Sequence, residues 1–320
     1  MQLSSEIITA SANAVHDGGA HLFWSGRIDE TLMDSIREFG QTTPVLAQET
    51  DSGLKLISGH ARLAILRDLG TPILVRLVLD ASPVDKGLLY MTDNASRAMD
   101  DGMRLAALKY FAPLLERKEL QATILPRLNV KPKSKDAKLL MAWLELPENW
   151  QNHLSAGHVP LAAGAVIARM SDDDMTAVEP LFANFSWSRS NAVNMLNWLF
   201  ETSKMMAAPM AEVIRIHGME RLLHQGLSPK DTIARLTTLA KAARYPELTA
   251  LNDSFAEAAR ELTVGTNWRV SQTNNFETGG AEIAVQIKTP EQLKKAMQDL
   301  ETMASLTPWE TIWNLGGRND

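Results

Sequence analysis

Residues 35–78, SIREFGQTTPVLAQETDSGLKLISGHARLAILRDLGTPILVRLV, decide the fold of the first part of the chain. Just before and within this stretch, apolar residues recur at spacings of four and three from Leu32 to Phe39, which predicts an amphipathic helix. Asp29 precedes this helix as a capping residue, and Gly40 follows it, where glycine commonly ends helices. The stretch therefore begins with a well-bounded helix.

The remainder of the stretch predicts strands around a second helix. Pro44 to Ala47 and Leu54 to Ser58 are short apolar runs on either side of an Asp-Ser-Gly turn, and Ile73 to Leu79 is a third β-type run. Between the second and third runs, a helix opens at Gly59 and stops at Gly70. The order helix, strand, turn, strand, helix, strand describes a small α/β domain. The apolar residues of the second helix that are expected to face inward are Leu63, Leu66 and Leu69.

The flanking regions differ from this domain. The lead contains glycine and shows little periodicity, so we expect it to be partly flexible. Residues 84 to about 245 are almost entirely helix-like with short breaks, which indicates a packed helical domain. The predicted fold class is α+β and multidomain: a small α/β domain, a helical middle and a C-terminal α-β-β-α piece. The predicted boundaries are 1–26 for the flexible lead, 27–98 for the α/β domain, 99–246 for the helical domain and 247–320 for the C-terminal region.

Composition excludes several classes of protein. The 320 residues include no cysteine, which rules out disulfides, thiolate nucleophiles and cysteine-based metal sites and fits a reducing cytoplasm. No run approaches the roughly 18 apolar residues of a membrane span, and the N-terminus lacks the pattern of a secretory signal, so a cytoplasmic protein is expected. The net charge of −6 means that DNA binding requires a local basic face.

The middle of the chain predicts a helix-turn-helix. Glu119 to Leu128 is amphipathic, Asn129 to Ser134 makes a turn, and Lys135 to Leu144 forms a second helix. Pro126 lies inside the first helix and should kink or shorten it.

Positive charge is concentrated on this segment. From Arg117 to Lys138 there are seven basic and two acidic residues, a net charge of +5, so the rest of the chain sums to −11. Basic side chains at the start of the second helix would meet phosphates, and Ser134 could cap that helix and also reach a phosphate. A solvated surface turn is the alternative. The candidate DNA-binding residues are Arg127, Lys131, Lys133, Ser134, Lys135 and Lys138.

Two segments of the first domain carry groups suited to phosphate. In Gly59-His60-Ala61-Arg62, glycine lets the backbone approach a ligand, the free N–H groups of the new helix can hold a phosphate, and Arg62 adds charge-assisted bonds. In Asp93 to Arg97, a carboxylate, an amide and a guanidinium can converge on a phosphate and its Mg²⁺. Alternatives stay open: Arg62 can pair with a neighbouring carboxylate, Asp93 can cap a helix and pair with Arg97, and His60 can be a polar surface residue.

The C-terminal region predicts a piece that needs a partner. Residues 276–300, FETGGAEIAVQIKTPEQLKKAMQDL, contain a turn ending in Gly279-Gly280, an alternating strand and an amphipathic helix that begins at Thr289-Pro290. A two-stranded hairpin is marginal in water by itself. The partner is either a second copy of the chain, which would give a homodimer, or the helical domain.

These segments resemble the ParB-like family. Residues 35–78 and 93–97 are similar to its N-terminal domain, which is also related to sulfiredoxin, and residues 118–174 are similar to its helix-turn-helix and the helices that follow. Residues 255–300 look like its C-terminal dimerisation element. The resemblance implies a nucleotide-binding first domain, a DNA-binding middle and a dimeric C-terminal region.

The resemblance also implies CTP and Mg²⁺ as ligands. The family's Gly-Glu-Arg-Arg is here Gly59-His60-Ala61-Arg62, so one arginine is missing and a histidine replaces the acid. The family's glutamate is here Asp93, which is one methylene shorter, so binding and hydrolysis of CTP both stay open. The implied nucleotide-binding residues are Gly40, Pro44, Gly59, His60, Arg62, Asn94 and Arg97, and the implied metal ligands are Asp93 and Asn94.

The expected function is that of a dimeric DNA-binding protein in plasmid or chromosome partition that acts as a CTP-gated DNA clamp. Double-stranded DNA, a second copy of the chain and a ParA-like ATPase are the expected partners, and a membrane is not. The alternative is a transcriptional or plasmid-maintenance regulator of the same fold with a degenerate nucleotide site. Any catalysis would be slow CTP hydrolysis at most, because the sequence has neither cysteine for sulfiredoxin chemistry nor a dense acidic cluster for a two-metal nuclease.

Overall fold

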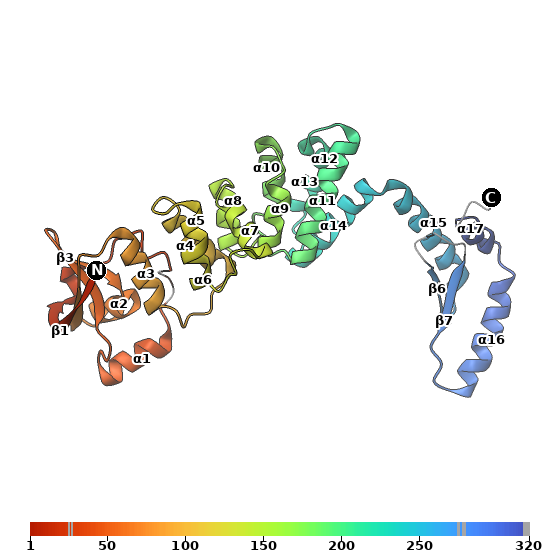
Figure 1. Cartoon of the computed structure of the whole chain (residues 1–320). Helices are drawn as coiled ribbons and strands as arrows, with labels where there is room; N and C mark the ends of the chain where they lie inside the picture. The colour runs from red at the N-terminus through yellow and green to blue at the C-terminus, as the bar shows by residue number, and fades with distance from the viewer. Residues whose placement is uncertain (25, 27, 274–275, 277–279, 316–320) are drawn as a thin grey trace. The chain divides into compact units, whose positions relative to one another are not determined.

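The computed structural model of the chain describes residues 1–24, 26, 28–273, 276 and 280–315 (Figure 1). The chain divides into two compact units, Met1–Asn197 and Trp198–Asp320. The fold class is α+β, as predicted: a five-stranded mixed sheet is followed by many helices, and then by a two-stranded hairpin with helices. In the described part of the chain, none of the helices has the length and apolar character needed to span a bilayer.

The first unit begins with the mixed sheet, whose strand order is β1-β5-β3-β4-β2. β3 pairs antiparallel with β4 and parallel with β5, as expected for a hairpin followed by a helical crossover. The predicted order of helix, strand, strand, helix and strand is confirmed. These elements are α1 (Glu30–Phe39), β3 (Val45–Thr50), β4 (Gly53–Ser58), α2 (His60–Asp68) and β5 (Pro72–Leu79).

The first 26 residues differ from the flexible lead that the sequence predicts. β1 (Gln2–Ser11) pairs antiparallel with β5, and β2 (Val15–His16) pairs with β4, so the lead supplies both edge strands of the sheet. Most side chains of β1 are exposed or half-buried, which explains why the strand lacks a clear alternation of apolar residues. Trp24 is buried, and its indole Nε1 donates a hydrogen bond to the Met103 carbonyl at 2.8 Å.

Helix α2 corrects one predicted core position. Leu63 and Leu66 are buried, as predicted, but Leu69 is exposed. The helix ends at Asp68, so Leu69 is the C-cap and leaves the buried face. Ile65 is buried in addition.

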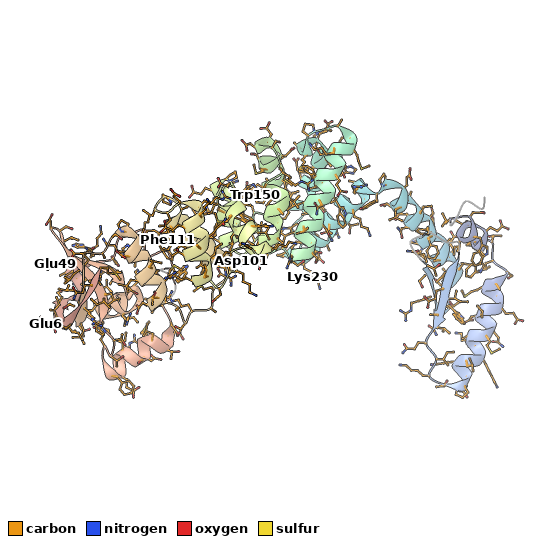
Figure 2. All side chains as sticks on the ribbon, in the orientation of Figure 1. Glu6, Glu49, Asp101, Phe111, Trp150 and Lys230 are labelled. Carbon is orange, nitrogen blue, oxygen red and sulfur yellow. The ribbon has the colours of Figure 1, made fainter. Side chains whose placement is uncertain are left out.

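The middle of the chain is helical, as predicted. After α3 (Pro83–Asp93), many of its apolar side chains are buried, and Phe111 and Trp150, labelled in Figure 2, are fully buried. The last helix of this region, α11 (Arg189–Met206), runs across the boundary between the two units. The other segments are α4 (Asp101–Phe111), α5 (Arg117–Glu119), the π-helix η2 (Leu120–Ile124), α6 (Leu125–Arg127), α7 (Lys135–Trp143), α8 (Glu148–Ser155), η3 (Leu161–Ala163), α9 (Gly164–Ile167), α10 (Asp172–Val178) and η4 (Glu179–Leu181).

The second unit contains helices followed by the predicted α-β-β-α piece, with one further helix, α17, at its end. Its C-terminal core is a cluster of Phe255, Ala258, Leu262, Met303 and Ile312. The predicted turn at Gly279-Gly280 lies partly outside the described residues. The elements are α12 (Met210–Ile216), α13 (Met219–Leu223), α14 (Pro229–Arg244), α15 (Pro246–Thr263), β6 (Trp268–Gln272), β7 (Ala281–Val285), α16 (Pro290–Ala304) and α17 (Pro308–Asn314).

Candidate functional site

The first helix of the predicted helix-turn-helix is helical from Arg117 to Arg127 but changes type along its length. Its central part, η2, is a π-helix in which the Leu125 N–H donates to the Leu120 carbonyl. Pro126 has no N–H to continue the α-helical ladder, and a π-type turn is a common way to accommodate such a break. The predicted disturbance at Pro126 is therefore present as a π segment.

The turn between the two helices is held by backbone and capping bonds. Asn129 has a positive φ of 59°, its N–H donates to the Pro126 carbonyl at 3.1 Å, and the Val130 N–H donates to the Leu125 carbonyl at 2.9 Å. This pair of bonds is a Schellman motif with asparagine in the left-handed position. Ser134 then caps α7, since its Oγ accepts from the Ala137 N–H at 3.1 Å.

Burial decides which part of α7 a ligand can reach. Beyond its first turn the helix is mostly inside the core, so only the N-terminal end is presented to solvent. The exposed side chains of that end are Lys135, Asp136 and Lys138. The buried residues of α7 are Ala137, Leu139, Leu140, Met141 and Trp143.

The basic residues of the turn lie together on the exposed side of this motif. Among the residues that the structure describes, no carboxylate lies within 4.0 Å of the basic side chains from Arg127 to Lys138. Arg117, by contrast, pairs with Glu145 at 3.2 Å. The charge of the basic side chains of the turn is therefore not neutralised by the protein. The exposed basic residues are Arg127, Lys131, Lys133, Lys135 and Lys138, which we call the basic turn.

A pocket in the first domain brings together most of the predicted nucleotide-binding residues. Its volume is about 450 Å³, which suits a small-molecule ligand. Gly40 and Pro44 do not line it; the loop between them does, through Gln41, Thr42 and Thr43. Gln41 fixes this loop to β5, because its side chain bonds both the N–H and the carbonyl of Leu74. The predicted residues that line the pocket are Gly59, His60, Arg62, Asp93, Asn94 and Arg97.

Gly59 begins α2 beside this pocket in a conformation that favours glycine. Its φ is +100°, and a Cβ at this position would lie 2.6 Å from Cγ1 of Val45. Unlike its neighbours, α2 has no side-chain cap, so its first N–H groups remain available to an anion. The helices directly before and after it, α1 (Asp29) and α3 (Ser82), each have a side-chain cap.

The charged groups of the pocket are already paired. Arg62 Nη2 donates to Asp93 Oδ2 at 3.0 Å, and the Ser58 hydroxyl donates to the same oxygen. Arg97 Nη1 donates to the Trp24 carbonyl at 2.9 Å. The structure thus contains the ion pair of Arg62 with a neighbouring carboxylate that the sequence left as the alternative.

Asp93 and Asn94 do not occupy the helix N-terminus that the sequence offered as the other interpretation of this segment. Asp93 is the last residue of α3, and Asn94 is its C-cap. Asn94 is buried, and its Nδ2 donates to the Tyr90 carbonyl at 2.8 Å. Sequence reasoning also missed Ser58, although it directly precedes Gly59.

The residues do not fit a protein-held Mg²⁺ ion. Mg²⁺ needs octahedral oxygen ligands, but Asp93 already accepts bonds from Ser58 and Arg62. Within the described ranges, no group of three or more histidine or acidic side chains is arranged to hold a metal.

His60 lies near a second carboxylate. Its Nε2 is 3.9 Å from Asp17 Oδ2, and Arg67 Nη1 is 3.1 Å from the same atom. Burial raises the pKa of Asp17, but the hydrogen bond and charge of Arg67 outweigh it, so the pKa lies below its usual value. Asp17 is therefore an anion close to His60.

The comparisons with known proteins concern structure only, since no family model and no curated protein matches the sequence. A C-terminally truncated ParB from Caulobacter crescentus complexed to the centromeric parS site matches over 72% of this chain and 99% of its own, with 13% identity and a TM-score of 0.37. The chain is similar in structure to ParB proteins.

Two further ParB structures are similar to the chain. The Caulobacter crescentus ParB complexed with CTP-γ-S matches over 55% of this chain and 97% of its own, with 19% identity and a TM-score of 0.27. A Pnob8-like ParB-N domain matches over 79% of this chain and 98% of its own, with 18% identity and a TM-score of 0.34. The similarity to ParB therefore covers most of the chain at low sequence identity.

Proposed function

We propose that this chain binds double-stranded DNA through the basic turn and the first turn of α7. The observation that carries the proposal is the exposed cluster of unneutralised basic side chains on a helix-turn-helix, in a chain whose net charge is −6. Phosphate contacts supply most of the affinity of such proteins. The basic turn would hold the DNA backbone while α7 approaches the major groove with its N-terminal end.

The short exposed part of α7 favours binding that depends on phosphates more than on bases. Lys135, Asp136 and Lys138 are its exposed polar side chains, and none of them is an arginine, asparagine or glutamine. Asparagine and glutamine are the usual contacts to adenine, and arginine or lysine to guanine, so this short end offers only two lysines and one acid for contacts to bases. We therefore expect modest discrimination between DNA sequences from this helix alone.

We further propose that the chain forms a homodimer through its C-terminal piece. The sheet of β6 and β7 has two strands, which alone are marginal in water, and the core cluster of α15 covers it on one side. Apolar side chains remain exposed on β7, on the segment that joins it to α16 and on α16 itself, and a second copy would cover them. These side chains are Ile283, Ile287, Leu293 and Met297.

The pocket at α2 is proposed to hold a nucleotide phosphate, with CTP as the candidate nucleotide. The uncapped N-terminus of α2 and the charge of Arg62 support this role. Two features weaken it: Ala61 stands where the ParB-like family has an arginine, and Asp93 pairs with Arg62. For a chain that binds CTP we propose a cytoplasmic role in plasmid or chromosome partition, with a ParA-like ATPase as partner. A ParB-fold regulator with a degenerate nucleotide site is the second candidate, and the Arg62–Asp93 pair favours it.

Duplex binding at a series of salt concentrations tests DNA binding. The expected result is a negative slope of log K against log salt, reduced by about one for each lysine of the basic turn replaced with glutamine. Selection of DNA from a random pool, with and without CTP, then tests the nucleotide. A pool enriched only with CTP supports a clamp, and enrichment that ignores CTP supports the regulator. No binding to any duplex refutes the proposal.

A further inference from the structure

We infer that the second unit carries a second DNA-contacting helix-turn-helix, formed by α13, the turn at 224–228 and α14. The resemblance to ParB-like proteins was drawn on residues 35–78, 93–97, 118–174 and 255–300, so it assigns no role to residues 200–246. The inference rests on the proposed DNA binding only for the choice of ligand. Its evidence is the geometry, burial and charge of the segment itself.

The turn of this segment shares two features with that of the first motif. Gly226 has a left-handed φ of +65°, the conformation that Asn129 adopts in the first turn. Ser228 then caps α14, since its Oγ accepts from the Asp231 N–H at 3.2 Å, as Ser134 caps α7. Both motifs therefore join two helices through a short turn that contains a left-handed residue and ends in a serine N-cap.

The buried side of the segment fixes α14 to its neighbours. Met219 and Leu222 of α13 and Leu236 of α14 are buried, and α13 and α14 are in contact. The opposite side of α14 is exposed over about three turns, whereas α7 exposes only its first turn. The exposed residues of that side are Lys230, Asp231, Ala234, Arg235, Thr238 and Lys241.

The exposed side of α14 is positively charged and not neutralised. The exposed charged residues of this side are three basic residues and Asp231, a net charge of +2. Nearby basic residues outside this face are paired: Arg215 lies 3.5 Å from Glu212, and Arg244 lies 2.5 Å from Glu201. Over the described ranges, no carboxylate lies within 4.0 Å of the basic side chains of this face. These basic side chains are Lys230, Arg235 and Lys241, which we call the α14 face.

The spacing along α14 matches a DNA groove. Lys230, labelled in Figure 2, and Lys241 are eleven positions apart, which corresponds to about 16 Å along a helix. The major groove is about 12 Å wide, so the two lysines can reach phosphates on opposite sides of it. Arg235 lies between them along the helix axis but about 120–140° around the helix from both lysines, so it would make a separate contact beside theirs. A double-stranded partner accounts for both the spacing and the charge.

Salt-dependent binding of full-length variants to a fixed duplex tests the inference. The variant K230Q/R235Q/K241Q should lower the slope by about two to three and weaken binding at moderate salt. The control K55Q/R260Q/K288Q removes the same charge from exposed residues elsewhere and should leave the slope within about half a unit of the wild type. The variant K131Q/K133Q/K135Q reports on the basic turn separately.

The outcomes separate this inference from the proposed function. If only the basic-turn variant lowers the slope, the second interface is wrong and the proposed function stands. If the wild-type chain binds no duplex, both are wrong. If the α14 variant loses helicity, the wild-type chain decides: acetylation of Lys230 and Lys241 should slow by severalfold when duplex DNA is added, while Lys55 and Lys288 should react at unchanged rates. Equal rates for all four lysines overturn the inference.

Discussion

Replacing Gly59 with alanine perturbs the junction between β4 and α2 that lines the proposed phosphate site. At φ +100° an alanine pays the left-handed penalty of about 1–2 kcal/mol. Its Cβ would also meet Val45 Cγ1 at 2.6 Å, and Val45 is fully buried, so overpacking adds about 1–3 kcal/mol. The expected loss of stability is the sum, about 2–5 kcal/mol.

Gly70→Ala is the matched control, because Gly70 also has a positive φ, +65°, but a Cβ there meets nothing within 4 Å. We expect it to cost only the backbone part, about 1–2 kcal/mol. Urea unfolding of the full chain measures both through the midpoint of the transition. The double variant Gly59→Ala/Val45→Ala should lose about 1 kcal/mol less stability than the sum of the two single variants. The reasoning is refuted if Gly59→Ala costs no more than Gly70→Ala.

The remaining predictions concern separate parts of the molecule. Ser134→Ala should destabilise the chain by about 1 kcal/mol in urea unfolding, because it removes the N-cap of α7. Ser134→Asp keeps a cap but should weaken DNA binding, because its carboxylate then faces the phosphates. Equal DNA affinity of Ser134→Asp and the wild type would contradict the proposed docking. Asp93→Asn frees Arg62 and should raise CTP affinity in calorimetry, and an absence of heat in both proteins points to a degenerate site. Burial lowers the pKa of His21, so the unfolded chain takes up its proton first. Stability should therefore fall as the pH drops below about 6.5 toward the lower folded pKa, and a His21→Gln variant should lose this dependence over that window. Met297→Glu should shift sedimentation from dimer to monomer, and an unchanged dimer would place the interface elsewhere.

The sequence predicted those elements whose physical signals are local. Gly40 and Gly59 mark helix ends that the structure confirms, because each adopts a positive φ that other residues avoid. Ser134 can likewise be predicted as a helix cap, because this role depends only on the three residues that follow it. The helix-turn-helix can therefore be predicted from the spacing of apolar residues and the position of basic ones.

Features that depend on contacts between residues far apart in the sequence cannot be predicted in this way. β1 forms because its backbone bonds with β5 about seventy residues later, and its mostly exposed side chains leave no apolar alternation. The pairing of Asp93 with Arg62 likewise joins residues 31 apart in sequence. The segment around α14 was missed because its charge is spread along one helix face and becomes a cluster only when the buried and exposed sides are known.

The distribution of charge connects the two candidate DNA interfaces. The segments 117–138 and 215–241 carry +5 and +3, so the remaining residues sum to −14 in a chain of −6. An acidic remainder repels the DNA backbone, which confines productive encounters to the two basic segments. Each segment lies in a different unit, so two moderate contacts on one chain would raise the effective concentration of DNA at the second once the first has formed. Strong duplex binding then needs no extensive base-reading surface on α7, which is consistent with the burial of most of that helix.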